Sequence, residues 1–148
     1  MSEKLLNDSI LQQVQSVFHK LQEPVGVLFF GTERGCEYCA DTRQLLEEVV
    51  ALSDKLSLEI YDLEQDAEIA RRYRVDKAPA IVIHGWDGEK PVDYGMRFYG
   101  IPAGHEFSAL IQALLLVSEG DSGLQPETRQ FLHELNQPVH LQVFSTPT

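Results

Sequence analysis

The chain has 148 residues, of which 43% are hydrophobic and 24% are charged, and its formal net charge is −11. A chain of this length can bury a real apolar core, so it does not need disulfide staples for stability. The negative charge argues against a nucleic-acid partner, whose binding requires clustered lysine and arginine. No apolar run approaches the roughly 20 residues of a membrane-spanning helix, so no membrane partner is expected.

The first half of the chain alternates between helical and strand patterns. Apolar residues at helical spacing predict a helix over residues 6–21, which Pro24 ends because its ring cannot continue the helix. The continuous apolar run 25–30 predicts a strand that is buried on both faces. Helical spacing returns over residues 41–52, and alternation with a period of two over residues 56–63 predicts the next strand.

The second half of the chain closes the predicted sheet. Residues 66–73 predict a short helix with an acidic start, which suits the helix dipole. Two strands, residues 80–84 and 92–99, flank a turn, and a final helix opens at residues 102–104 and stops at Gly120. Strands that alternate with helices and end in a hairpin predict an α/β fold with a central mixed sheet and helices on both faces.

The only two cysteines lie together in Cys36-Glu37-Tyr38-Cys39. The loop between them is too short to stabilise the chain much as a staple, so the pair favours chemistry over structure. A cysteine at a helix N-terminus is more readily ionised, because the dipole and free N–H groups stabilise a thiolate. The pattern predicts a redox-active disulfide in which Cys36 attacks and Cys39 resolves, with Glu37 opposing thiolate formation and Arg34 favouring it.

A zinc site is the alternative interpretation of a cysteine pair at this spacing. Zinc in a structural site takes four ligands. The sequence offers no third cysteine, and its five histidines form no close pair. We therefore expect no metal and no cofactor.

The end of the chain repeats its beginning. Residues 132–139 match residues 18–25 in a His, Leu, Pro and Val pattern, and residues 141–144 repeat the strand pattern of residues 27–30. The sequence therefore predicts one domain over residues 1–120, followed over residues 121–148 by a helix and a strand that open a second, truncated unit. The alternative is an appended helix and strand whose similarity is due to chance.

Three segments carry a resemblance to a known family: Cys36-Glu37-Tyr38-Cys39, residues 72–80 and residues 97–107. They resemble the protein disulfide oxidoreductases of thermophilic prokaryotes, described as glutaredoxin-like, which carry two thioredoxin-fold units in tandem. The chain is similar to their first unit, and residues 143–148 resemble the approach to their second Cys-x-x-Cys site. The resemblance implies a thioredoxin-like fold and a thiol–disulfide oxidoreductase activity.

The resemblance also implies a substrate platform opposite the cysteines. In this fold the Ala78–Pro79 peptide is cis and faces the cysteine pair, so an extended substrate can pair with the backbone of Ala78. The expected substrate-binding residues are Tyr38, Ala78 and Pro79, although a proline at this position can also simply start a strand. Thioredoxins carry a buried aspartate at the position of Phe30, so another proton acceptor is needed here: Glu33, Glu37 or water.

The expected partners follow from this chemistry. They are protein or small-molecule disulfides as substrates and a reductase or a small thiol as electron donor, in the cytoplasm, since the N-terminus lacks the layout of a signal peptide. An alternative function is a non-enzymatic docking module or a homodimer joined through the strand over residues 139–144. Glutathione-dependent reduction would need cationic residues near Pro79 to bind the glutathione carboxylates. The candidates are Arg71, Arg72, Arg74 and Lys77, and the favoured alternative is that they form a solvated helix face.

Overall fold

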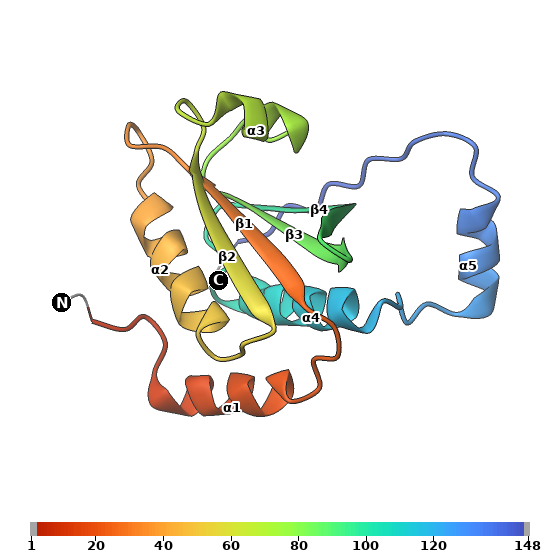
Figure 1. Ribbon diagram of the computed structural model, residues 1–148, viewed down its shortest axis with the longest axis horizontal. Coiled ribbons are helices and arrows are strands. Elements are labelled where there is room, and N and C mark those ends of the chain that lie inside the picture. The colour runs from red at the N-terminus through yellow and green to blue at the C-terminus, as the bar shows by residue number, and fades with distance from the viewer. Residues whose placement is uncertain (1–2, 147–148) are drawn as a thin grey trace.

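The computed structural model describes residues 3–146 and contains one four-stranded mixed sheet with the strand order β2-β1-β3-β4 (Figure 1). Its strands are β1 (Val25–Gly31), β2 (Leu56–Asp62), β3 (Ala80–Asp87) and β4 (Lys90–Tyr99). Strand β1 runs parallel to β2 and antiparallel to β3, and β3 and β4 form an antiparallel hairpin. The predicted central mixed sheet is therefore confirmed.

Helices cover both faces of this sheet. The helices of the described chain are α1 (Asp8–Phe18), α2 (Cys39–Val50), α3 (Ala67–Arg72), α4 (His105–Glu119) and α5 (Pro126–His133). Helices α1, α2 and α4 contribute buried residues to the larger core cluster, and α3 contributes to a smaller cluster on the opposite face. The prediction of helices on both faces is confirmed.

Strand β1 is buried along its whole length because it lies between β2 and β3 with core on both sides. Successive side chains of a strand point to opposite faces. Val27 and Phe29 accordingly belong to the larger cluster, while Leu28 and Phe30 belong to the smaller one. This two-sided burial explains why the run in the sequence is continuously apolar rather than alternating.

The N-terminal segment is fastened to α2, the helix that begins at Cys39. The Glu48 carboxylate accepts hydrogen bonds from the backbone N–H groups of Leu5 and Leu6, at 2.9 and 3.1 Å. Partial burial raises the pKa of Glu48, but these two bonds and one from Gln44 outweigh it, so the pKa is lowered overall. The ionised carboxylate thereby holds the start of the chain against the helix.

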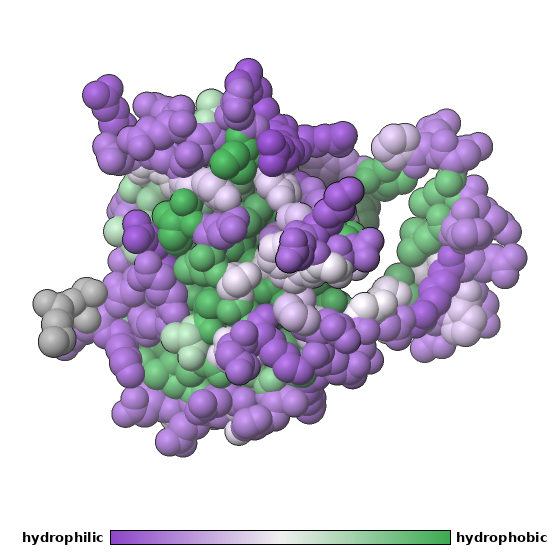
Figure 2. Space-filling view, viewed as in Figure 1, coloured by the Kyte–Doolittle hydropathy of each residue, from purple (hydrophilic) through white to green (hydrophobic). Residues whose placement is uncertain are grey.

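The segment after α4 differs from the prediction in one respect. A helix, α5, forms as expected, but residues 139–144 pair with no strand among the described residues, so the prediction of a strand there is wrong for this structure. Leu141 is 85% exposed, whereas Val27, its counterpart in the repeat, is 1% exposed. Helix α5 stands apart from the sheet, and apolar residues face solvent along this arm (Figures 1 and 2). Residues 139–144 have the apolar sequence pattern of a buried strand, but the described residues offer no neighbouring strand with which they pair.

Candidate active site

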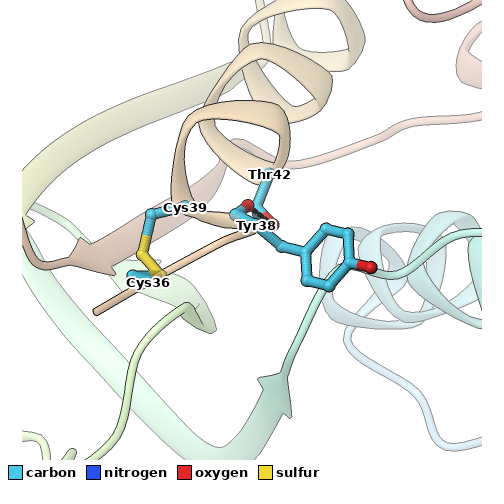
Figure 3. The surroundings of a disulfide bond; sticks show 4 residues. All are labelled: Cys36, Tyr38, Cys39 and Thr42. Atoms are coloured by element: carbon cyan, nitrogen blue, oxygen red, sulfur yellow. Dashed lines mark hydrogen bonds between the residues drawn. A yellow bond between two sulfur atoms is a disulfide. The ribbon is translucent and has the colours of Figure 1, made fainter. Parts of the chain in front are cut away.

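Cys36 and Cys39 are joined by a disulfide, with their Cα atoms 5.5 Å apart (Figure 3). Cys39 is the first residue of α2 and only 8% exposed, whereas Cys36 lies in the loop between β1 and α2 and is half-buried. The pair therefore sits at a helix N-terminus, where the dipole and the free N–H groups favour a thiolate. Of the two sulfur-bearing side chains, Cys36 is the more accessible to a substrate.

Tyr38 forms the junction between the cysteine loop and α2. It is the N-cap residue, and its side chain is 48% exposed and points away from the disulfide (Figure 3). Its carbonyl oxygen accepts two hydrogen bonds from Thr42, one from the backbone N–H at 2.9 Å and one from the hydroxyl Oγ1 at 2.7 Å. The ring of Tyr38 is thus exposed to solvent, while its backbone carbonyl is fixed by two hydrogen bonds.

Thr42 is a residue of this site that the sequence did not predict. Its side chain is fully buried on the same face of α2 as Cys39 and Leu45. The available signal was a hydroxyl-bearing residue on an otherwise apolar helical stripe, one turn after the second cysteine. A buried hydroxyl is normally present with a hydrogen-bond partner, and this one has the Tyr38 carbonyl.

The Ala78–Pro79 peptide bond is cis, as the resemblance implied. Pro79 is buried, and Ala78 packs against the core cluster that includes Cys39 and against which Cys36 also packs. The carbonyl oxygen of Pro79 accepts a hydrogen bond from the N–H of Gly100 at 2.9 Å, which ties this loop to the end of β4. The loop before β3 and the cysteine pair therefore share one side of the core.

Arg97 of β4 holds the chain that leads into this loop. Its guanidinium donates to the carbonyl of Tyr73, directly after α3, at 2.7 Å and to the Asp93 carboxylate at 2.7 Å. The hydrogen bond from Arg97 outweighs partial burial and lowers the pKa of Asp93. The ion pair with Asp93 fixes the Arg97 side chain, which links β4 to the segment that leads to Pro79.

Phe30, which the comparison with thioredoxins placed at the position of their buried aspartate, does not face the cysteine pair. It is fully buried on the face opposite Cys39, where its ring is stacked on Tyr61 with centroids 5.4 Å apart. Phe29 and Gly31 face the cysteine side instead: Phe29 shares the core cluster of Cys39, and a Cβ on Gly31 would lie 3.6 Å from the Cys39 sulfur. Phe29 and Gly31 are not ionisable either. Strand β1 therefore offers no carboxylic acid beside the disulfide, but Phe29 and Gly31, and not Phe30, are the residues that show it.

The cationic residues near Pro79 lie on the surface. Arg71, Arg72 and Arg74 are exposed, and Arg71 bonds to the carbonyl of Ala67 in its own helix at 3.4 Å. Lys77 pairs with Asp76 at 2.9 Å and lies over the ring of Tyr99, 5.7 Å from its centroid. The hydrogen bond and the charge of Asp76 raise the pKa of Lys77. This arrangement fits the solvated helix face better than a glutathione site.

Two properties of the described residues, 3–146, bear on the kind of protein. No group of three or more His, Cys, Asp or Glu side chains in that range could hold a metal ion. No helix in the same range has the length and apolar character needed to cross a membrane.

A disulfide at the start of a helix, a cis Ala78–Pro79 peptide on the same side of the core and a β2-β1-β3-β4 sheet define the thioredoxin-like class of proteins. Residues 26–112 match the model of the thioredoxin domain family. The chain therefore belongs to that family, and the predicted α/β thioredoxin-like fold is confirmed.

Two solved structures are similar to most of this chain. A protein disulfide oxidoreductase from Aeropyrum pernix is similar with a TM-score of 0.76 and 28% identity, over 87% of this chain and 55% of that chain. The N-terminal domain of the alkyl hydroperoxide reductase AhpF from Enterococcus faecalis gives a TM-score of 0.73 and 26% identity, over 84% and 58%. The predicted resemblance to a thioredoxin-fold disulfide oxidoreductase family is confirmed.

A curated relative is similar over most of the chain. The AhpF protein of Pseudomonas aeruginosa, an alkyl hydroperoxide reductase component, is 27% identical over 123 residues, which is 83% of this chain and 20% of that protein. The chain thus spans about a fifth of this relative and little more than half of the solved structures named above. The Cys36–Cys39 pair fits the Cys-x-x-Cys redox site of such a disulfide oxidoreductase.

Proposed function

We propose that the chain is a thiol–disulfide oxidoreductase that exchanges disulfides through Cys36 and Cys39. The observation that carries the proposal is their unequal exposure at the start of α2, with Cys36 half-buried and Cys39 buried. Nucleophilic attack on a substrate needs an accessible thiolate, while resolution needs a second thiol within reach of the first sulfur. Cys36 is thus the attacking residue and Cys39 the resolving residue.

The reducing direction proceeds in two exchanges. The Cys36 thiolate attacks one sulfur of a substrate disulfide, which forms a mixed disulfide and releases the other substrate sulfur as a thiolate. The Cys39 thiolate then attacks Cys36, releases the second substrate thiolate and leaves the Cys36–Cys39 disulfide. The substrate gains two electrons, which a reductase or a small thiol returns to the cysteine pair, and the reverse sequence oxidises a substrate dithiol.

The proposed binding surface lies around the more accessible sulfur. The exposed Tyr38 ring supplies apolar contact area, and the backbone of Ala78 before Pro79 offers hydrogen-bonding groups to an extended substrate segment. The proton of the resolving thiol passes to Glu33, Glu37 or water. Both glutamates are exposed in the cysteine loop or next to it, and Phe29 and Gly31 of β1 provide no acidic group.

A disulfide-reduction assay tests this activity. With insulin as substrate and dithiothreitol as electron donor, the folded chain should accelerate the precipitation of reduced insulin B chains over dithiothreitol alone. A Cys36→Ser/Cys39→Ser double variant is the matched control, because it keeps the fold and removes both sulfurs. Equal rates for the chain and this control would overturn the proposal and favour a non-enzymatic role.

A second candidate role, docking or homodimer formation, is favoured by the exposed arm after Gly120. We propose that residues 121–148 represent the opening of a second thioredoxin-like unit and that residues 139–144 pair with another chain when a partner strand is available. The supporting observation is the repeat: Phe30 is fully buried, while Phe144 at the matching position is 90% exposed. Light scattering on the whole chain and on a version ending at Gly120 tests this, since a monomer in both cases would exclude the dimer.

We also propose a cytoplasmic location. Stable structural disulfides are rare in that compartment, whereas transient catalytic ones are found there. This chain has two cysteines, and its core does not depend on a disulfide, so its composition is compatible with the cytoplasm. Fractionation of cells that make the protein, with detection by antibody, would test the location, and recovery with secreted proteins would contradict it.

A further inference from the structure

We infer that Thr42 is a positioning residue that sets the redox behaviour of Cys36, an inference that rests on the proposed function of the cysteine pair. Thr42 acts on Cys36 through the backbone of Tyr38. Its hydroxyl is fully buried and donates to the Tyr38 carbonyl at 2.7 Å. The effect on Cys36 follows from the geometry of the next peptide bond.

The Tyr38–Cys39 peptide unit contains the Tyr38 carbonyl, which accepts the hydrogen bonds from Thr42, and the Cys39 N–H, which is the first N–H group of α2. This peptide is trans, because Ala78–Pro79 is the cis bond found among the described residues. In a planar trans peptide the C=O and N–H bonds point in opposite directions. When Thr42 fixes the carbonyl along the helix, the Cys39 N–H must point out of the helix N-terminus, the end at which the Cys36 loop joins it.

That N-terminus is not capped by a side chain. The N-cap residue is Tyr38, with φ −106° and ψ 8°, and its side chain makes no capping hydrogen bond to the first turn. The N–H groups of the first turn are donors for a negative charge placed at this end of the helix. A Cys36 thiolate is such a charge, so its stability depends on how firmly the Tyr38–Cys39 peptide is oriented.

Two hydrogen bonds from Thr42 orient the Tyr38–Cys39 peptide, and they differ in how specific they are to threonine. The bond from its N–H, at 2.9 Å, is the ordinary helical one and exists for any residue at this position except proline. The bond from Oγ1 is specific to a hydroxyl-bearing side chain. Threonine hydroxyls often bond to the carbonyl four residues back, so the bond alone does not define a role. A role in positioning must show itself in the thiol chemistry and not only in stability.

The test compares three variants by two readouts. Thr42→Val has nearly the same shape but no hydroxyl, Thr42→Ser keeps the hydroxyl, and Ser118→Ala removes another buried hydroxyl that bonds to backbone groups of Gln22 and Glu23, away from the cysteines. The first readout is the equilibrium of the Cys36–Cys39 couple with reduced and oxidised glutathione. The second is the pH profile of Cys36 alkylation by iodoacetamide, read by mass spectrometry.

Loss of the hydroxyl should weaken the stabilisation of the thiolate and therefore of the reduced protein. For Thr42→Val we expect the equilibrium to move about threefold toward the disulfide, a potential about 14 mV more negative, since a tenfold change corresponds to about 30 mV. The midpoint of the alkylation profile should rise by about half a pH unit, the same factor on a logarithmic scale. Thr42→Ser should restore both values, and Ser118→Ala should leave both at wild-type values while lowering the melting temperature.

Wild-type values for Thr42→Val in both readouts would overturn the inference, as would an equal shift in Ser118→Ala. Both readouts follow the thiols themselves and need no turnover of a substrate. A wild-type chain that fails to reduce insulin while Thr42→Val still shifts the two values would therefore count against the proposed function and in favour of this inference.

Discussion

The imidazole ring of His84 in β3 lies directly over Gly26 in β1, in the space that a side chain at position 26 would need. His84 is 2% exposed, and its Nδ1 lies 2.9 Å from the carbonyl oxygen of Gly85. Its ring meets Trp86 edge-on, with centroids 4.9 Å apart. The histidine therefore fills the gap that the glycine leaves in the sheet.

A Gly26→Ala substitution should destabilise the protein strongly, because the new Cβ would overlap the His84 ring. Both residues lie in paired strands, so relief requires a shift of the backbone or of a packed ring, at a cost of about 1–3 kcal/mol. Urea denaturation of the variant measures this cost. In a His84→Ala background the obstacle is gone, so the same substitution should cost at least about 1 kcal/mol less. Strict additivity of the two changes would contradict this packing.

Tyr61 should titrate well above the usual range of a tyrosine hydroxyl. Its hydroxyl donates to the Glu59 carboxylate at 2.6 Å, and this bond, with partial burial, raises the pKa of Tyr61 to about 12. The unfolded value is about 10, so the folded state holds this proton more tightly. The corresponding stability is fully present below about pH 10 and is lost as the pH rises through about 12.

Absorbance near 295 nm reports tyrosine ionisation and tests this directly. Tyr61→Phe should remove the component of the titration near pH 12, whereas Tyr94→Phe, which changes a ring that is 57% exposed, should leave that component in place. Loss of the high-pH component in Tyr94→Phe rather than in Tyr61→Phe would show that the hydrogen bond to Glu59 does not set the titration.

Deletion of the arm after Gly120 should leave the domain as stable as before. Every described residue from 121 to 146 is exposed, and α5 contributes no buried side chain. The core between the sheet and α4 is complete before that point, with Leu110, Leu114 and Val117 already buried. A chain ending at Gly120 should therefore melt within about 2 °C of the whole chain, a difference below about 0.5 kcal/mol for a domain of this size. A larger loss would show that the arm packs on the domain.

Much of this fold was predictable because its elements carry local signals. The run 25–30 became β1, the alternating run 56–63 became β2, and Gly120 ends α4 in the left-handed conformation that glycine favours. The cysteine pair was visible as a residue type with few structural uses at this spacing, whereas the cis bond before Pro79 was predicted through the family resemblance.

Other features depend on spatial neighbours and so had no local signal. A continuous apolar run hides which residues face which side, so the sequence could not tell Phe29 from Phe30 as the neighbour of Cys39. Residues 139–144 carry a strand pattern, but a strand forms only when another strand satisfies its backbone. The role inferred for Thr42 depends on the direction of one carbonyl, which only the structure gives.

The division of roles between the two cysteines is the central claim, and trapping of mixed disulfides tests it most directly. The reduced Cys39→Ser variant should attack a disulfide substrate with Cys36 and stop at the mixed disulfide, which mass spectrometry and non-reducing electrophoresis detect. The reduced Cys36→Ser variant keeps only the buried Cys39 and should trap none. Equal trapping by both variants, or trapping by Cys36→Ser alone, would contradict the account.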